Sequence, residues 1–278
     1  MRFVKKARYV KKIVAQARKK GKIIGFVPTM GYLHEGHLSL VRIARRKAQF
    51  TVVSLFVNPT QFGPQEDLQS YPRDLKRDKI LLKKEGVDLV FYPERTEIYP
   101  EGYSTYVEVQ GLSTILCGVS RPGHFRGVTT VVLKLFNIVQ PDIVVFGRKD
   151  FQQAVIIKRM VEDLDLNIKI VTGKIVREKD GLAMSSRNTY LSEKERENAT
   201  VLYQSLVWAK KAYSGGVRDP HWVIDKMRDM IENRGGKVDY VEAVDQKTLK
   251  PVKHLYKGTL IVLAVYFGKT RLIDNIVL

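Results

Sequence analysis

The sequence has only one cysteine, Cys117, among its 278 residues, so no disulfide can form within the chain. A lone cysteine is typical of proteins from a reducing compartment, and its apolar neighbours in STILCG indicate a packed thiol. Long apolar runs are also absent: segments such as TLIVLAVYFG are far shorter than the roughly 20 residues that a membrane-spanning helix needs. We therefore expect a soluble, cytoplasmic protein.

Acidic residues are missing from the first 34 positions, which is a bias that a transit peptide would also show. Apolar residues at positions 3, 4, 7, 10, 13, 14 and 17, however, repeat at the spacing of an amphipathic helix. This stretch leads directly into the apolar segment KIIGFVPTM at 22–30. We interpret it as the first helix of the folded domain.

Negative charge is scarce overall, and the net charge of +19 is unevenly distributed. Residues 1–174 carry 30 Lys and Arg against 16 Asp and Glu, whereas residues 175–278 carry 18 against 13. A positive field attracts nucleic acids, nucleoside triphosphates and carboxylate substrates alike. We find no stacking aromatics or recognition element among the basic residues, which argues against a nucleic-acid-binding protein. A solvated basic surface without a specific ligand remains the alternative.

Apolar, β-branched segments at 22–30, 50–58, 87–93 and 141–147 alternate with helical patterns. This alternation predicts an α/β fold with a Rossmann-like parallel sheet. Further on, the pattern predicts a helix over 192–213 opened by Ser192, a second helix over 221–235, and strands within 238–245 and 258–278. We therefore expect a Rossmann-like domain at 1–175 and a smaller α+β domain at 176–278.

The segment PTMGYLHEGH, residues 28–37, places two histidines three positions apart after the first apolar run. A zinc-protease helix needs histidines four apart, so His34 and His37 do not fit that site. A glycine after a strand-to-helix turn is not required by a pair of core histidines, which is the other alternative. We expect a helix that begins near Gly36, whose free N–H groups and histidines donate hydrogen bonds to phosphate oxygens.

Other polar loops follow the remaining strands. In GRKDFQQ, Lys149 is placed to reach a phosphate, Asp150 to bind ribose hydroxyls or Mg²⁺, and Gln153 to reach an acid substrate. In FVNPTQF, the neutral amides of Asn58 and Gln61 can read hydroxyls and carboxylates. For each loop, an ordinary polar turn is the alternative interpretation.

A fourth polar segment, GLAMSSRN at 181–188, lies at the expected domain junction. Its hydroxyls and guanidinium suit phosphate oxygens. The H-x-G-H pattern after the first strand resembles the signature of the nucleotidyltransferase superfamily, which includes class I aminoacyl-tRNA synthetases, and GLAMSSRN resembles its mobile phosphate loop. An adenylyltransferase of this superfamily is the nearest alternative function.

Together with RPGHFRGV at 121–128, these motifs resemble those of the pantoate–β-alanine ligase family, from about residue 23 to 191. The resemblance implies ATP-dependent ligation in two steps. The carboxylate of (R)-pantoate attacks the α-phosphorus of ATP to give pantoyl adenylate and pyrophosphate, and the amine of β-alanine then expels AMP. It also implies Mg²⁺ and a homodimer.

The resemblance also implies roles for individual residues. The expected catalytic residues are His37, His34, Lys149 and Arg187, and His37 matches the family's proton donor; the residues themselves leave open whether it transfers a proton or only donates a hydrogen bond. The expected nucleotide contacts are Met30, Gly31, Tyr32, Leu33, His34, Glu35, Gly36, His37, Gly147, Arg148, Lys149, Asp150, Val176, Met184, Ser185, Ser186 and Arg187. The expected contacts of pantoate and β-alanine are Gln61, Gln153, Asn58, Tyr71 and Arg121. No metal ligands are assigned.

Overall fold

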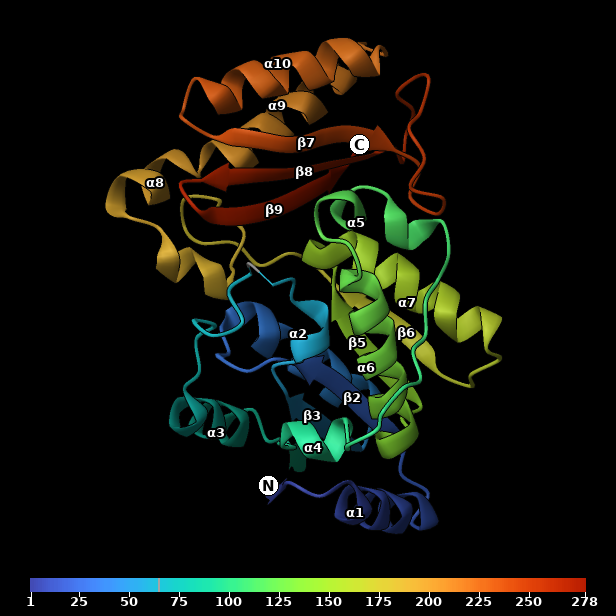
Figure 1. Cartoon of the computed structure of the whole chain (residues 1–278). Coiled ribbons are helices and arrows are strands. Elements are labelled where there is room, and N and C mark those ends of the chain that lie inside the picture. The colour runs from blue at the N-terminus through green and yellow to red at the C-terminus, as the bar shows by residue number, and fades with distance from the viewer. Residues whose placement is uncertain (65) are drawn as a thin grey trace.

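The computed structural model describes residues 1–64 and 66–278, which form two sheets with their covering helices (Figure 1). The larger sheet has six parallel strands in the order β1-β4-β3-β2-β5-β6, and the smaller has three antiparallel strands in the order β7-β8-β9. This arrangement confirms the predicted fold class, a Rossmann-like sheet followed by a smaller α+β part.

The strands of the larger sheet are β1 (Arg2–Val4), β2 (Ile24–Thr29), β3 (Phe50–Leu55), β4 (Leu89–Phe91), β5 (Ile143–Gly147) and β6 (Lys169–Gly173). The helices around it are α1 (Ala7–Lys19), α2 (Glu35–Lys47), α3 (Leu75–Lys84), α4 (Arg95–Ile98), α5 (Cys117–Ser120), α6 (His124–Val139) and α7 (Phe151–Asp163). Short 3₁₀ turns are η1 (Pro59–Gln61), η2 (Leu112–Thr114), η3 (Arg148–Asp150) and η4 (Ser186–Tyr190). The C-terminal part contains α8 (Glu193–Asn198), α9 (Val201–Ser214), α10 (Pro220–Glu232), β7 (Lys237–Val244), β8 (Leu260–Phe267) and β9 (Thr270–Val277).

Successive residues of the parallel strands face opposite sides of the sheet. Phe26 and Val144 pack on the side of α1, α6 and α7, whereas Val27 and Val145 pack on the side of α2 and α3. Because both faces are covered, the central strands are apolar along almost their whole length. This is why the sequence shows them as continuous apolar runs.

The central strand β2 lies between β3 and β5. From β2 the chain builds outwards to β3 and β4, and it later returns to β5 and continues outwards to β6 on the other side. Such a reversal of strand order opens a crevice at the carboxyl ends of the two strands where it occurs. The loops after Thr29 and Gly147 therefore meet at this point.

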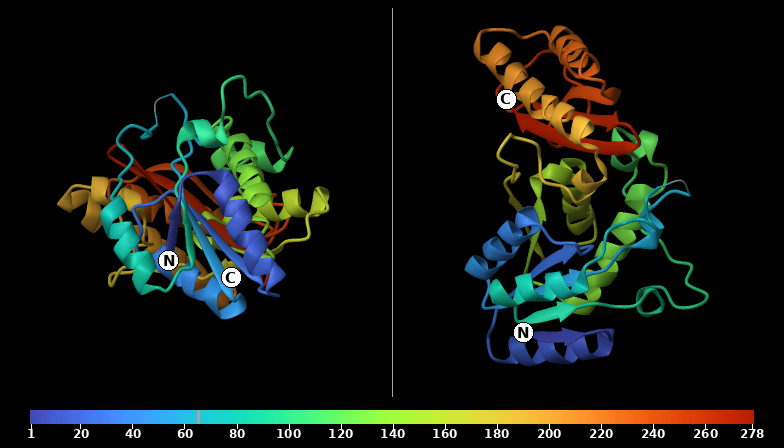
Figure 2. Two further views of the ribbon diagram at one scale, coloured as in Figure 1. Left: turned by 90° about the horizontal axis from the view of Figure 1, so that it is seen from below. Right: turned by 90° about the vertical axis from the view of Figure 1, so that its left-hand side faces the viewer.

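The antiparallel sheet has two different neighbours. One face packs against α9 and α10. The other face, which includes Leu260 and Val262, packs against Leu116 and Phe151 of the larger part. The two views of Figure 2 and the view of Figure 1 agree that this sheet stands across the end of the parallel sheet. The loops at the carboxyl edge of the parallel sheet thus lie between the two sheets.

Two predictions of helices are wrong, and two strands were not predicted. The helix expected from residue 3 begins at Ala7, since Phe3 and Val4 belong to β1 and pair with β4. Strand β6 was not predicted, although it pairs with β5 along its whole length. The helix expected over 192–213 is interrupted between α8 and α9, but Ser192 does open α8 with a capping box. Over residues 1–64 and 66–278, no helix is long and apolar enough to cross a membrane.

Candidate active site

A cavity of about 150 Å³ lies at the carboxyl ends of β2 and β5. Many of the residues predicted to contact a nucleotide line it: Met30, His34, Gly36, His37, Gly147, Lys149, Asp150, Val176, Met184, Ser185, Ser186 and Arg187. Leu40, Lys174 and Ile175, which were not predicted, and Tyr71, which was predicted to contact substrate, line it as well. Three motifs that are distant in the sequence therefore share one small cavity.

The other predicted nucleotide residues are not among those that line this cavity: Gly31, Tyr32, Leu33, Glu35 and Arg148. Leu33 is fully buried in the core, and Glu35 forms an ion pair with Arg42 on the surface of α2. Gly31 and Tyr32 form a turn with positive φ angles. The buried carboxylate of Asp78 on α3 fixes this turn, because it accepts hydrogen bonds of 2.8 Å from the N–H groups of Tyr32 and Leu33. Asp78 is a supporting residue that the sequence motif did not reveal.

The imidazole rings of His34 and His37 contact each other at the start of α2, with 4.1 Å between ring centroids and 41° between the ring planes. The Nδ1 atom of His34 accepts a hydrogen bond from the N–H of Gly36 at 3.1 Å, and that of His37 accepts from the N–H of His34 at 3.3 Å. A backbone N–H can only donate, so in each neutral ring the proton is on Nε2.

Both histidines are held in their neutral form. Burial, followed by the positive charge of Lys149, lowers the pKa of His34 to about 4. Burial, followed by the neighbouring His34, lowers the pKa of His37 well below its usual value. At pH 7 the two rings therefore present two Nε2–H donors and no net charge.

Gly36 has a different role from the one expected. Helix α2 begins at Glu35, and the N–H of Gly36 is occupied by the ring of His34 instead of being free for an anion. A Cβ atom on Gly36 would lie 2.8 Å from two atoms of that ring. The glycine is thus required for His34 to fold back over the first turn of the helix.

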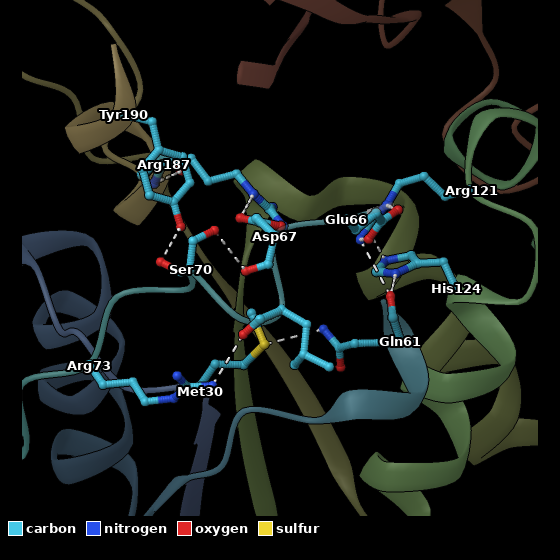
Figure 3. A network of polar contacts seen from close by, with 12 residues as sticks. Met30, Gln61, Glu66, Asp67, Ser70, Arg73, Arg121, His124, Arg187 and Tyr190 are labelled. Atoms are coloured by element: carbon cyan, nitrogen blue, oxygen red, sulfur yellow. Dashed lines mark hydrogen bonds and ion pairs between the residues drawn. The ribbon is translucent and has the colours of Figure 1, made fainter. Parts of the chain in front are cut away.

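Arg187 and Arg121 are each held by a carboxylate of the 66–67 segment (Figure 3). Arg187 donates from Nε and Nη2 to Asp67 at 2.9 and 2.8 Å, and Arg121 donates from Nε and Nη2 to Glu66 at 2.7 and 2.6 Å. Burial opposes the ionisation of Asp67, but the hydrogen bonds and charge of Arg187 lower its pKa overall. The guanidinium predicted to bind a triphosphate is therefore paired with a carboxylate in this structure.

A chain of amide hydrogen bonds orients Gln61. The hydroxyl of Tyr99 donates to Oδ1 of Asn58 at 2.8 Å, so Nδ2 of Asn58 faces Oε1 of Gln61 at 3.1 Å. The Nε2 atom of Gln61 then points towards the sulfur of Met30, at 3.3 Å (Figure 3). Asn58, which is 1% exposed, supports Gln61 from behind. The atom that Gln61 can offer to a ligand is a donor.

The RPGHFRGV segment contacts the η1 turn, which contains Gln61, from another side. His124 lies with Nδ1 2.8 Å from the carbonyl oxygen of Gln61 and with Nε2 3.1 Å from Arg121. Burial, followed by the charge of Arg121, lowers the pKa of His124 to about 4. A Cβ on Gly127 would lie 2.2 Å from the carbonyl oxygen of Thr60. His124 and Gly127 therefore position Gln61, a role that only their place in the motif hinted at.

A second cavity of about 940 Å³ adjoins the first and lies between the two sheets. The two cavities share Lys149, Asp150, Ser185 and Arg187. The predicted substrate residues Gln153 and Arg121 line the larger cavity. Gln61 contacts His124 and Arg121, which line the larger cavity, and Met30, which lines the smaller one. The structure thus offers a small cavity and a larger one that share four lining residues.

No group of three His, Cys, Asp or Glu side chains suited to a metal ion occurs in the part of the chain that the structure describes. Asp150 lines both cavities, and its side chain is 49% exposed. Mg²⁺ that accompanies a nucleotide is usually held by one or two carboxylates together with phosphate oxygens. Asp150 fits this kind of site, in which the nucleotide supplies most of the ligands.

Comparison with known proteins agrees with these features. The pantoate-beta-alanine ligase family model matches residues 2–277. A pantothenate synthetase from Caldicellulosiruptor bescii is 55% identical over 278 residues, which cover 100% of this chain and 99% of that protein.

Solved structures match over the same length. The crystal structure of pantothenate synthetase from Thermus thermophilus has a TM-score of 0.95 and 44% identity, and the match covers 99% of each chain. A pantoate-beta-alanine ligase from Francisella tularensis, in complex with beta-gamma ATP and beta-alanine, has a TM-score of 0.85 and 37% identity, covering 100% of this chain and 97% of that one. The chain therefore belongs to the pantoate–β-alanine ligase family.

Proposed function

We propose that this chain, a ligase of pantothenate biosynthesis, uses ATP to activate (R)-pantoate as pantoyl adenylate before joining it to β-alanine. A pantoate carboxylate oxygen attacks the α-phosphorus while the bond to pyrophosphate breaks. The amine of β-alanine then attacks the acyl carbon, and AMP leaves. The observation that carries the proposal is the convergence of His34, His37, Lys149 and Arg187 on a cavity that shares a wall with a larger one.

Charge neutralisation and positioning supply most of the catalysis in such a phosphoryl-centred step. Lys149 and Arg187 offset the charge of the triphosphate. The Nε2–H groups of His34 and His37 donate to phosphate oxygens as negative charge moves to the leaving pyrophosphate. Because burial keeps His37 neutral at pH 7, we assign it hydrogen-bond donation in preference to proton transfer.

Pantoate is bound by Gln61 and Gln153 in this proposal. Donation by Nε2 of Gln61, fixed through Asn58, suits the carboxylate or a hydroxyl of pantoate. Arg121 lines the larger cavity and is available to attract the acid substrates once Glu66 releases it. Tyr71 stands beside Arg187 in the smaller cavity, at 6.0 Å from ring to guanidinium, and would contact the adenylate end of the site.

Mg²⁺ bound to the nucleotide would reduce the repulsion between its phosphates and the attacking carboxylate, and Asp150 is the residue suited to hold it. We further infer that residues 1–175 act as the ATP- and pantoate-binding domain and that residues 176–278 close over it. From the family resemblance we infer a homodimer. From the single cysteine we infer a location in the reducing cytoplasm.

The proposal is tested by an assay that omits one component at a time. With ATP, Mg²⁺, pantoate and β-alanine together, we expect AMP and pyrophosphate in equal amounts, and without β-alanine only slow release of pyrophosphate. Equal ATP consumption with and without pantoate would contradict the proposal. A product that retains AMP would instead identify an adenylyltransferase.

A further inference from the structure

Asn275 on strand β9 reaches from the C-terminal sheet to the loop that carries Lys149. Its side-chain nitrogen donates to the carbonyl oxygen of Arg148 at 2.9 Å and to that of Lys149 at 3.0 Å. Asn275 is 5% exposed and is 126 residues away from Lys149 in the sequence. Both partners are carbonyl oxygens, so the orientation of the Asn275 amide is fixed by chemistry.

The two carbonyls belong to the two peptide planes on either side of the Lys149 Cα. The relative orientation of these planes is set by φ and ψ of Lys149, since peptide groups are themselves rigid. An NH₂ group that binds both carbonyls therefore restrains both dihedral angles. Because the Cα–Cβ direction follows from the backbone, the same contact fixes the direction in which the Lys149 side chain leaves the loop.

A second contact of β9 supports the other side of the nucleotide cavity. Asp274, the neighbour of Asn275, forms an ion pair with Arg177, and Arg177 also donates to the carbonyl oxygen of Gly181 at 3.1 Å. Gly181 opens the segment that leads to Met184 and Arg187. Two successive residues of β9 thus hold both the Lys149 turn and the start of the 181–188 segment.

We propose that Asn275 is a positioning residue for the adenylation step, which acts by fixing the Lys149 turn from β9. The inference rests on the proposed function, in which Lys149 binds the phosphates of ATP. It assigns to the C-terminal sheet a direct part in building the nucleotide site. Neither the motifs nor their spacing place any residue after Arg187 in this role.

The test replaces Asn275 and measures ATP binding directly by calorimetry, alongside the KM values for ATP and β-alanine. Loss of two hydrogen bonds in Asn275→Ala is expected to weaken ATP binding about tenfold, with the KM for β-alanine within about twofold of the wild type. Asn275→Asp should weaken ATP binding further, because its carboxylate would face two carbonyl oxygens. Asn275→Ser retains one donor, so its ATP affinity should lie between those of the wild type and Asn275→Ala. It replaces Asn275→Ala in the test if the alanine variant folds poorly.

Gln246→Ala is a matched control, because Gln246 also donates from a side-chain amide to a backbone carbonyl, that of Gly258 at 2.7 Å. It should lower the melting temperature without changing ATP affinity. Lys149→Met provides the second control. If Asn275 acts through Lys149, adding Asn275→Ala to Lys149→Met weakens ATP binding by less than about twofold.

The outcomes separate the two proposals. A wild-type protein that does not bind ATP contradicts the proposed function itself. A wild-type protein that binds ATP, with unchanged affinity in Asn275→Ala and Asn275→Ser, contradicts only the role of Asn275. Effects of Asn275→Ala and Lys149→Met that multiply in the double variant would likewise overturn it, since a merely structural contribution would be independent of Lys149.

Discussion

Replacement of Asp67 by asparagine should make ATP bind more tightly. Arg187 binds both carboxylate oxygens of Asp67. In the proposed mechanism it must therefore exchange them for phosphate oxygens when ATP binds. The side chains of the pair are 27% and 21% exposed, which places the pair between the surface and the interior. Charge-assisted hydrogen bonds in such positions contribute about 1.5–3 kcal/mol. An asparagine at position 67 retains one neutral acceptor. The free energy needed to separate Arg187 from residue 67 should therefore fall by roughly 1.4 kcal/mol, which corresponds to about tenfold tighter ATP binding.

The affinity of Asp67→Asn for a non-hydrolysable ATP analogue can be measured by calorimetry in the absence of pantoate. Glu66→Gln is the matched control, because Glu66 is the next residue and binds Arg121 in the same bidentate way. It removes the same charge without freeing Arg187. Unchanged or weaker binding by Asp67→Asn, or equal tightening by Glu66→Gln, would refute the idea that Arg187 leaves Asp67 to bind the nucleotide.

Three further predictions concern Gln61 and the histidines. Gln61→Ala should raise the KM for pantoate about tenfold through the loss of one hydrogen bond to a charged group, and an equal rise in the KM for ATP would contradict that role. Gly36→Ala should weaken ATP binding at least tenfold, because its Cβ would displace the ring of His34; normal ATP affinity would exclude this arrangement. Since the pKa values of His34 and His124 are about 4 in the folded protein and about 6.5 in the unfolded chain, the unfolded chain binds protons first as the pH falls. The free energy of unfolding, measured by urea titration, should therefore decrease from about pH 6.5 down to about pH 4, by at most ~3 kcal/mol per histidine, and a flat profile would count against the neutral rings.

The central part of the fold was predictable because its signals are local. Strands β2, β3 and β5 are buried on both faces, and their apolar runs stand out against the helices between them. Strands β1 and β6 lie at the edges of the sheet, and β6 contains exposed residues such as Lys169 and Thr172. Their strand conformation depends on pairing with a distant neighbour, so the local pattern did not distinguish it from a helix or a loop.

The same distinction applies to the site. The loops after β2 and β5 were predicted from their glycines and polar residues, since the carboxyl ends of parallel strands meet at one edge. Glu66, Asp67 and Asn275 were not predicted, because their partners are 55, 120 and 126 residues away. Ordinary acidic and amide residues carry no local sign of such contacts. Asn58 was predicted as a substrate contact from its position after β3, whereas its hydrogen bonds to Tyr99 and Gln61 became visible only in three dimensions.

The two adjacent histidines also bear on the selectivity of the site towards transition-metal ions. Both Nδ1 atoms cap the start of α2, so an ion such as Zn²⁺ has access only to Nε2. Coordination there requires the proton to move from Nε2 to Nδ1, which breaks the hydrogen bonds from the N–H groups of Gly36 and His34. Each lost cap costs about 1 kcal/mol. Binding of a metal ion would therefore break the hydrogen bonds that cap the first turn of α2. The pair thus discriminates against transition-metal ions, although histidine is the commonest metal ligand in proteins.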